Sequence, residues 1–255
     1  MGRILLGTSG WDYPEWVGRV YPKKGVADRL RYYAERFPLV EVNTTFYRLP
    51  PVSVVESWVR RTPDGFRFAA KFPRSITHER RLQAAGSELA AFLEVIRPLR
   101  DAGKLVAALL QLPPSLPFDE PAVRGFYESL PADLPVAVEF REESWLAPES
   151  IELLRAHRFA HVVVDEPKLP IRLDVTAPFS YVRWHGHGSA IWYDYTYSKA
   201  ELDAWVPRVR ALAERADPVL GLFNNHFRGD AAVNAEALAE ALGVPPPAWS
   251  HRLGG

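Results

Sequence analysis

The sequence from Pro135 to Trp145 reads PVAVEFREESW, and it shows the pattern that decides the fold. A short apolar run, Val136 to Val138, ends abruptly in Glu139, Phe140 and Arg141. Side chains on a strand alternate between two faces, so the carboxylate and the guanidinium point to the same side. This stretch therefore predicts a buried strand that ends in charged groups.

The same pattern recurs along the chain. Amphipathic segments lie between most of the apolar runs, and Ser198-Lys199-Ala200-Glu201 is a capping box that predicts a helix start. The connection from Lys168 to Phe179 has no helical period. Eight short apolar segments bounded by turn residues predict strands at Ile4–Thr8, Leu39–Asn43, Phe66–Phe72, Leu105–Leu112, Pro135–Phe140, His161–Asp165, Tyr181–His185 and Val219–Asn224. Strands alternating with helices predict an α/β fold, a single (β/α)8 TIM-type barrel over residues 1–255, irregular between strands six and seven.

Composition narrows the class of protein. Hydrophobic residues make up 47% of the chain, which is enough for a sizeable core, and 31 basic residues balance 31 acidic ones. No global field therefore attracts nucleic acid or an anionic membrane. The lack of cysteine excludes disulfides, thiolate metal sites and cysteine nucleophiles. The sequence shows no apolar stretch long enough for a signal peptide or a membrane span, so we expect a cytoplasmic protein without a membrane partner.

Polar and charged residues follow most of the apolar runs, where each strand ends. The connections that leave the strands are long, and long ordered loops at one end of a barrel usually carry function. In a barrel these groups converge on the mouth formed by the carboxyl ends of the strands. For any one charged member the alternative is a structural ion pair. The substrate-binding candidates at this mouth are Asn43, Arg141, Arg183, His185, Asn225, Arg228, Trp11, Tyr47 and Trp192.

Two carboxylates stand at the ends of adjacent predicted strands. Glu139 and Asp165 in a partly dry cleft would push each other's pKa values apart, which yields one proton donor and one acceptor. We therefore predict that they form the catalytic acid–base pair. The alternative is that Glu139 pairs with Arg141 or Arg183, two arginines that could otherwise hold an anion.

Lys71 is the third predicted catalytic residue, and its role is to stabilise developing charge. It follows Phe68-Ala69-Ala70, and such apolar surroundings lower the pKa of a lysine and favour Schiff-base chemistry. The alternative is a solvated or ion-paired lysine. Two glycine-containing loops, His185–Ser189 and Asn225–Gly229, follow the strands at whose ends barrels commonly bind phosphate, although their glycines could also serve only as turns.

Several segments taken together resemble the YecE-like family of TIM-barrel proteins of unknown function. They span nearly the whole chain: Gly7-Thr8-Ser9-Gly10-Trp11 with Tyr13, Trp16 and Tyr21-Pro22; Val40 to Tyr47; Phe68 to Lys71 with Thr77-His78; Gln111-Leu112-Pro113-Pro114; Glu139-Phe140-Arg141 with Ser144-Trp145; Arg183-Trp184-His185-Gly186; and Phe223-Asn224-Asn225-His226. The resemblance implies a barrel and supplies no established reaction. A looser likeness to endonuclease IV-type barrels adds a DNA-related or metal-dependent role as a conjecture.

We expect no cofactor, with a divalent metal as the alternative. Imidazole and carboxylate ligands suit a hydrolytic metal ion. The residues that would bind it are Glu139, Asp165, His185 and His226, although no HxH or HExxH spacing supports the site.

Binding of single-stranded nucleic acid is the alternative to an enzyme. The segment Lys71 to Leu82 is locally basic, and Trp192 to Tyr197 offers aromatic faces on which bases could stack. Solvated charges also explain the basic segment, and the balanced net charge favours that explanation. The leading hypothesis is an enzyme, a hydrolase or a lyase, that acts on a small anionic substrate of phosphate-bearing or sugar-like chemistry.

Overall fold

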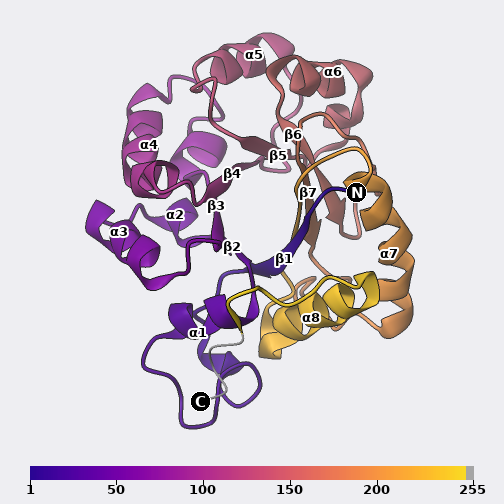
Figure 1. Cartoon of the computed structure of the whole chain (residues 1–255). Coiled ribbons are helices and arrows are strands. Elements are labelled where there is room, and N and C mark those ends of the chain that lie inside the picture. Colours follow the sequence, from indigo (N-terminus) through magenta and orange to yellow (C-terminus); the bar gives the residue numbers. More distant parts are fainter. Residues whose placement is uncertain (251–255) are drawn as a thin grey trace.

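Eight parallel strands close into a barrel in the computed structural model, which describes residues 1–250. Each strand pairs with its neighbours in chain order, and β1 also pairs with β8. In Figure 1 the strands surround the centre and most of the helices lie outside them. The strands are β1 (Ile4–Ser9), β2 (Leu39–Val42), β3 (Arg67–Lys71), β4 (Leu105–Gln111), β5 (Val136–Glu139), β6 (Ala160–Asp165), β7 (Ser180–Trp184) and β8 (Val219–Phe223). The predicted barrel and its eight strands are confirmed.

Helices follow seven of the eight strands within residues 1–250. No helix separates β6 from β7, as the lack of period between Lys168 and Phe179 predicts. The predicted capping box is present, with Ser198 as N-cap and Glu201 closing it. The α-helices are α1 (Arg29–Arg36), α2 (Thr44–Tyr47), α3 (Val52–Arg61), α4 (Gly86–Asp101), α5 (Glu120–Glu128), α6 (Pro148–His157), α7 (Lys199–Ala213) and α8 (Asp230–Leu242), and four shorter helical turns are Pro14–Trp16, Ser75–Glu79, Glu143–Leu146 and Phe227–Gly229.

Alternate strand positions divide the buried side chains into two sets. One set faces the helices and forms two large apolar clusters with them. The other set is a separate cluster that fills the barrel interior, and it consists mainly of small or branched residues: Leu39, Ala69, Ala107, Leu109, Ala137, Ala160, Val162, Val164, Phe179, Tyr181, Leu220 and Leu222. Side chains therefore fill the barrel interior below the mouth. A ligand can bind only at the mouth, where the strands end.

A buried lysine secures the amino end of the barrel. Lys104 precedes β4, and its Nζ donates hydrogen bonds to the carbonyl oxygens of Val59 (2.9 Å) and Thr62 (2.8 Å) and to the Thr62 hydroxyl (3.1 Å). These acceptors lie at the end of α3, where carbonyl groups lack partners within the helix and a cation is favourable. Lys104 thus fixes α3 to the sheet.

Replacing Lys104 by Met should lower the free energy of unfolding by about 1–3 kcal/mol, because three acceptors, two of them in buried hydrogen bonds, would lose their donor. Urea unfolding monitored by circular dichroism measures the loss. Lys199→Met is the matched control, since the exposed Lys199 makes an ion pair with Asp203 on the same helix, and it should change stability by less than about 0.5 kcal/mol. Equal effects of the two substitutions would contradict this role of Lys104.

None of the helices in the described part of the chain combines the length and the apolar character that crossing a membrane requires.

Candidate active site at the barrel mouth

The last inward-facing position of five strands carries a polar side chain. Because inward and outward residues alternate, the positions that continue the apolar interior set bring these groups together at the mouth. Four of these side chains are largely or fully buried and the fifth is half-buried. The buried ones are Glu41, Lys71, Glu139 and Arg183, and the half-buried one is Gln111. The mouth is therefore lined by charges from strands that are far apart in the sequence.

Arg183 is the centre of this network. Its guanidinium donates to Glu41 Oε1 at 2.7 Å and to Glu139 Oε2 at 2.5 Å, and the Tyr181 hydroxyl donates to Glu41 Oε2 at 2.7 Å. All four side chains are buried. Burial by itself opposes charge on Arg183, but the two carboxylates outweigh it and raise its pKa further. The network is therefore a fixed set of ions at the floor of the mouth.

Glu139 is a permanent anion in this network. Burial acts to raise its pKa, but Arg141, Arg183 and His185 outweigh burial and hold the pKa well below its usual range. Arg141 contacts the Oε1 atom of Glu139 directly, so each carboxylate oxygen has an arginine. These contacts agree with the alternative derived from the sequence, in which Glu139 pairs with Arg141 or Arg183.

His185 connects the network to β8. Its Nε2 lies 3.2 Å from Glu139 Oε1 and 2.7 Å from Arg141, and its Nδ1 lies 3.0 Å from the Asn224 side-chain amide. Burial and the neighbouring Arg141 lower the pKa of His185 to about 3, so the imidazole is neutral at physiological pH. It positions groups by hydrogen bonding and adds no charge.

The predicted pair of Glu139 and Asp165 is not formed, and this expectation is corrected by the strand geometry. Asp165 follows the outward-facing His161 and Val163, so its side chain points toward α7. There its Oδ2 accepts from Trp205 Nε1 at 2.8 Å, and its Oδ1 lies 2.7 Å from His187 Nε2. Asp165 therefore anchors the connection between β7 and α7 and does not face the mouth.

The next residue, Glu166, occupies the inward position that the sequence interpretation gave to Asp165. Its Oε1 accepts from the backbone N–H of Leu169 at 3.0 Å, and its Oε2 lies 3.7 Å from Arg141 and has no hydrogen-bond partner in the described chain. Burial raises its pKa, and Arg141 only partly offsets that effect. Glu139 and Glu166 thus contact the same arginine but have pKa values shifted in opposite directions, which is the arrangement expected of an acid–base pair.

A cavity of about 210 Å³ opens beside Glu166. Two of the segments that line this cavity are the residues just after β6 and the long connection after β7. In that connection Gly186 has a φ of +91°, and a Cβ atom at this position would lie 2.5 Å from the carbonyl oxygen of Trp192. That conformation requires glycine at this position. The lining residues are Gln111, Pro114, Arg141, Glu166, Lys168, Trp192 and Tyr193. Two cations, one carboxylate with a raised pKa and two aromatic rings therefore surround a space of small-molecule size.

Lys71 is not one of the residues that line this cavity, but it contacts one of them, Gln111. Its Nζ donates to Gln111 Oε1 at 2.7 Å and lies 4.1 Å from the centre of the Phe46 ring. Burial, with a contribution from Arg183, lowers the pKa of Lys71 to about 8. The predicted apolar surroundings of Lys71 are present, and its partner is a neutral amide.

The four alternative metal ligands do not converge. Glu139 and His185 are in contact, but Asp165 faces α7, and His226 stacks on Tyr13 with ring centres 4.7 Å apart. Within residues 1–250 no group of three or more histidine, aspartate and glutamate side chains is arranged to hold a metal ion. The residues named from the sequence therefore do not form a site that fits a metal.

Other predicted binding residues lie around the rim or beneath it. Asn43 is half-buried with an unpartnered Oδ1, and Asn225 is buried and donates to the carbonyl of Tyr195 and to Asn234. Trp11 packs edge-on against Trp58, whereas Tyr47 is 80% exposed. Asn225 and Trp11 thus have structural contacts, and Tyr47 projects into solvent.

Arg228 does not form an anion site at the start of α8. It makes ion pairs with Asp194 and, at 3.3 Å, with the buried Asp230, which is the first residue of that helix and also pairs with Arg19 at 2.8 Å. The chain's own carboxylate therefore occupies the helix terminus that we expected to bind phosphate. Arg228 instead connects the loops after β7 and β8.

The basic segment after β3 is neutralised by its own surroundings. Arg74 lies 3.6 Å from Glu79, Arg80 pairs with Glu88 at 2.9 Å, and Arg81 donates to the Ser115 carbonyl at 2.8 Å. These contacts favour the interpretation of solvated structural charges over a track for a phosphate backbone.

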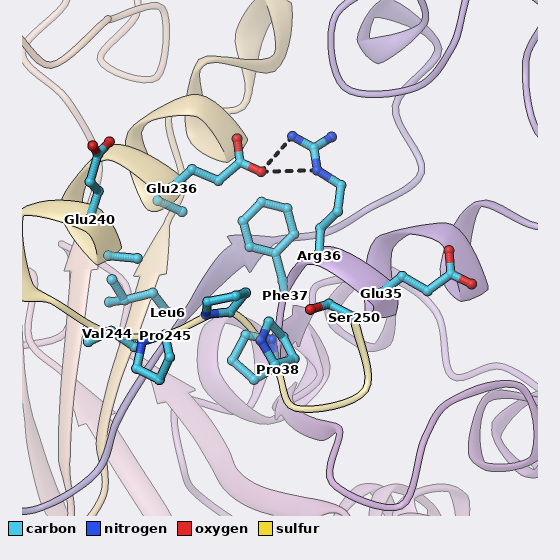
Figure 2. Close-up of a pocket in the computed structure, with 14 residues that line it drawn as sticks. Leu6, Glu35, Arg36, Phe37, Pro38, Glu236, Glu240, Val244, Pro245 and Ser250 are labelled. Atoms are coloured by element: carbon cyan, nitrogen blue, oxygen red, sulfur yellow. Dashed lines mark hydrogen bonds and ion pairs between the residues drawn. The ribbon is translucent and has the colours of Figure 1, made fainter. Parts of the chain in front are cut away.

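A roomier cavity of about 490 Å³ lies between α1 and α8, away from the mouth. Figure 2 shows Arg36 and Glu236 paired across it and Pro245 beneath them. Apart from a few rim charges its lining is apolar, and it contains neither the network of Arg183 nor Glu166. Size alone therefore does not identify the site, because the titratable groups with shifted pKa values gather at the mouth.

The fold and the mouth define a β/α barrel with a buried carboxylate–arginine network and a small polar cavity at the carboxyl ends of its strands. The chain belongs to the family described as protein of unknown function DUF72, whose model matches residues 5–252. This family membership confirms the predicted resemblance to YecE-like proteins.

Known relatives share nearly the whole chain. UPF0759 protein YunF of Bacillus subtilis (strain 168) is 29% identical, over 94% of this chain and 95% of its own length. UPF0759 protein YecE of Escherichia coli (strain K12) is also 29% identical, over 86% of this chain and 85% of its own. The crystal structure of a DUF72 family protein (TM1631) of Thermotoga maritima MSB8 is 34% identical, with a TM-score of 0.86 over 94% of this chain and 99% of that one.

A more distant likeness concerns the fold alone. An AP endonuclease, family 2, of Brucella melitensis is 11% identical with a TM-score of 0.53, over 91% of this chain and 97% of its own. This level of similarity shows a common barrel architecture.

Proposed function

We propose that this protein is an enzyme, a hydrolase or a lyase, that acts on a small phosphate-bearing or sugar-like anion at the barrel mouth. One observation carries the proposal. Buried polar groups in proteins nearly always have hydrogen-bond partners, yet several at this mouth have none within the described chain. Within the described chain they include Ser9 Oγ, Asn43 Oδ1, Arg141 Nε, Glu166 Oε2 and Arg183 Nε. Two of these groups, on Arg141 and Glu166, line the cavity, where a polar ligand would satisfy them.

The charges on the cavity favour an anionic ligand. Arg141 and Lys168 both line it, and Lys168 lies 5.2 Å from the centre of the Trp192 ring, where the aromatic face holds the ammonium at the rim. Arginine binds phosphate and carboxylate through paired hydrogen bonds. The aromatic faces of Trp192 and Tyr193 suit the apolar face of a sugar ring. We assign Arg141 and Lys168 to anion binding and Glu166 to proton transfer.

Binding of ribose 5-phosphate, measured by isothermal titration calorimetry, tests the anion site. Lys168→Met keeps the side-chain length but removes the charge at the rim, so we expect the affinity to fall about tenfold, as the loss of one charge-assisted contact implies. Lys199→Met removes an exposed charge from α7 and should leave the affinity unchanged. No binding by the native protein, or equal affinities for native protein and Lys168→Met, would contradict the assignment.

A further inference from the structure

Lys71 is a buried lysine that makes no ion pair within residues 1–250. No carboxylate oxygen of residues 1–250 lies within 4.0 Å of its Nζ, and the one hydrogen-bond acceptor there is the neutral Oε1 of Gln111. Lys104, the other buried lysine, has three oxygen acceptors at the end of α3. The structural role that explains Lys104 is therefore missing for Lys71.

The ion-paired network of Glu41, Glu139, Arg141 and Arg183 is balanced without a proton on Lys71. Glu41 and Glu139 are matched by Arg183 and Arg141 through close ion pairs. A charge on Lys71 is thus an added cation beside two arginines, which agrees with the lowering of its pKa to about 8 by burial and Arg183. At pH 8 about half of such an amine is neutral, against about 0.3% of an ordinary lysine with a pKa near 10.5. A neutral amine is a nucleophile.

Gln111 marks where a substrate carbonyl would lie. Its amide carbonyl accepts a hydrogen bond from Lys71, and the same side chain lines the cavity that contains Arg141 and Glu166. A carbonyl group that displaced the Gln111 oxygen would stand next to Nζ. The Phe46 ring covers Nζ at 4.1 Å and limits access of water, which would hydrolyse an imine.

We propose that Lys71 forms a Schiff base with a small aldehyde or ketone whose anionic group is held by Arg141 and Lys168. This inference rests on the proposed function and specifies its substrate class as carbonyl compounds. The Nζ lone pair attacks the carbonyl carbon, a C–N bond forms and the C=O π bond breaks. Glu166 transfers both amine protons, one after the other, from the nitrogen to the oxygen, first to give the carbinolamine and then to let the oxygen leave as water, so that amine and carbonyl become imine plus water with no oxidant or reductant.

Borohydride trapping tests the proposal. The purified protein is incubated at pH 8 with pyruvate in one arm and dihydroxyacetone phosphate in the other, reduced with sodium borohydride, and mapped by peptide mass spectrometry. The chain has six lysines, at positions 23, 24, 71, 104, 168 and 199, so each adduct can be assigned. We expect one adduct, on Lys71, and no adduct in the Lys71→Arg variant. The compound that gives the adduct shows whether the anionic group is a carboxylate, as in pyruvate, or a phosphate, as in dihydroxyacetone phosphate.

Three outcomes would overturn the Schiff base: no adduct in either arm, an adduct at Lys168 in place of Lys71, or equal labelling of the exposed Lys23, Lys24 and Lys199. Calorimetry with ribose 5-phosphate on the same preparation separates this failure from that of the proposed function. Retained binding without an adduct removes only the Schiff base, whereas loss of both removes the anion site as well. Thermal melting of Lys71→Arg confirms that a missing adduct does not reflect unfolding.

Discussion

Replacing Arg183 by Met is expected to lower the free energy of unfolding at pH 7 by about 3–5 kcal/mol, because it leaves buried carboxylates without their cation. Arg183 is 1% exposed and holds Glu41 and Glu139 at once. Glu139 keeps Arg141, whereas no other arginine or lysine of residues 1–250 makes an ion pair with Glu41. Most of the loss should therefore arise at Glu41. Urea unfolding of the native and variant proteins measures it.

The loss should also depend on pH. In the native protein the pKa of Glu139 is depressed, so its stabilising contribution is present above the usual pKa of 4.5 and disappears only as the pH falls through the lower folded-state value. Without Arg183, Glu139 still has Arg141 and His185, so its folded-state pKa rises toward its usual value. The variant therefore loses part of the stabilisation that a depressed pKa provides. The difference between native protein and variant should be full at pH 7 and should shrink as the pH falls below 4.5.

Two further variants make this prediction decisive. Glu41→Gln combined with Arg183→Met removes the unmatched carboxylate and should recover part of the stability, even if Arg183→Met alone does not fold. Arg97→Met removes an exposed arginine that pairs with Glu94 and Asp101 on α4, and it should cost less than about 0.5 kcal/mol. A cost below about 1 kcal/mol for Arg183→Met, or a cost independent of pH, would show that the network does not stabilise the fold.

The barrel itself could be predicted from the sequence because apolar strands and amphipathic helices have periods that are visible in the chain. Each of the eight predicted strands lies within two residues of the observed one, and the gap between β6 and β7 was apparent from its lack of period. These features depend on local patterns of burial. They do not depend on which distant residues meet.

The candidate site was less predictable because it depends on which side of each strand a residue faces. Glu139 and Asp165 each stand at the end of a strand. In the structure Val162 and Val164 face the barrel interior, so the next inward-facing position is Glu166 and not Asp165. A fully buried strand is apolar on both faces, so its sequence does not reveal which face is inside. The outward contact with Trp205 that settles the orientation joins segments 40 residues apart.

Neither Glu166 nor Lys168 was assigned a catalytic or binding role from the sequence, for the same reason. They lie just beyond β6, in the connection without a helix, where periodicity gives no orientation. Glu166 could have been predicted by extending the inward and outward alternation of β6 by one residue beyond the end of the strand. The cavity contact of Lys168 with Trp192 arises from the glycine-dependent turn after β7 and has no local signal.

Glu166→Gln is expected to lower turnover by about 10²–10⁴-fold, the usual effect of removing a catalytic acid or base. Gln keeps a carbonyl oxygen for the backbone N–H of Leu169, so the local hydrogen bond survives. Because burial raises the pKa of Glu166, its ionised form is a stronger base than an ordinary glutamate and also costs stability above that pKa. The variant should therefore be as stable as the native protein at pH 4.5 and more stable at pH 7.

The measurement begins with a screen of sugar phosphates and sugar acids by NMR, followed by kinetics on the first compound that the native protein converts. With Glu166 as general base, kcat/KM should rise with pH through a value above 4.5, and this rise should be absent from Glu166→Gln. Glu143→Gln, on the exposed turn after β5, is the control and should keep full activity.

Asp165→Asn separates the two neighbouring carboxylates. It weakens the contacts with Trp205 and His187 outside the barrel, so it should lower stability and leave kcat largely intact. If Asp165→Asn abolished turnover in a folded protein while Glu166→Gln did not, the proton-transfer role would belong to the outward residue and the mouth would have to be a binding site alone. If both retained full turnover, neither carboxylate would transfer a proton. Loss of kcat in Glu166→Gln, together with loss of the pH-dependent rise and unchanged or higher stability, is the result that a catalytic role for Glu166 predicts.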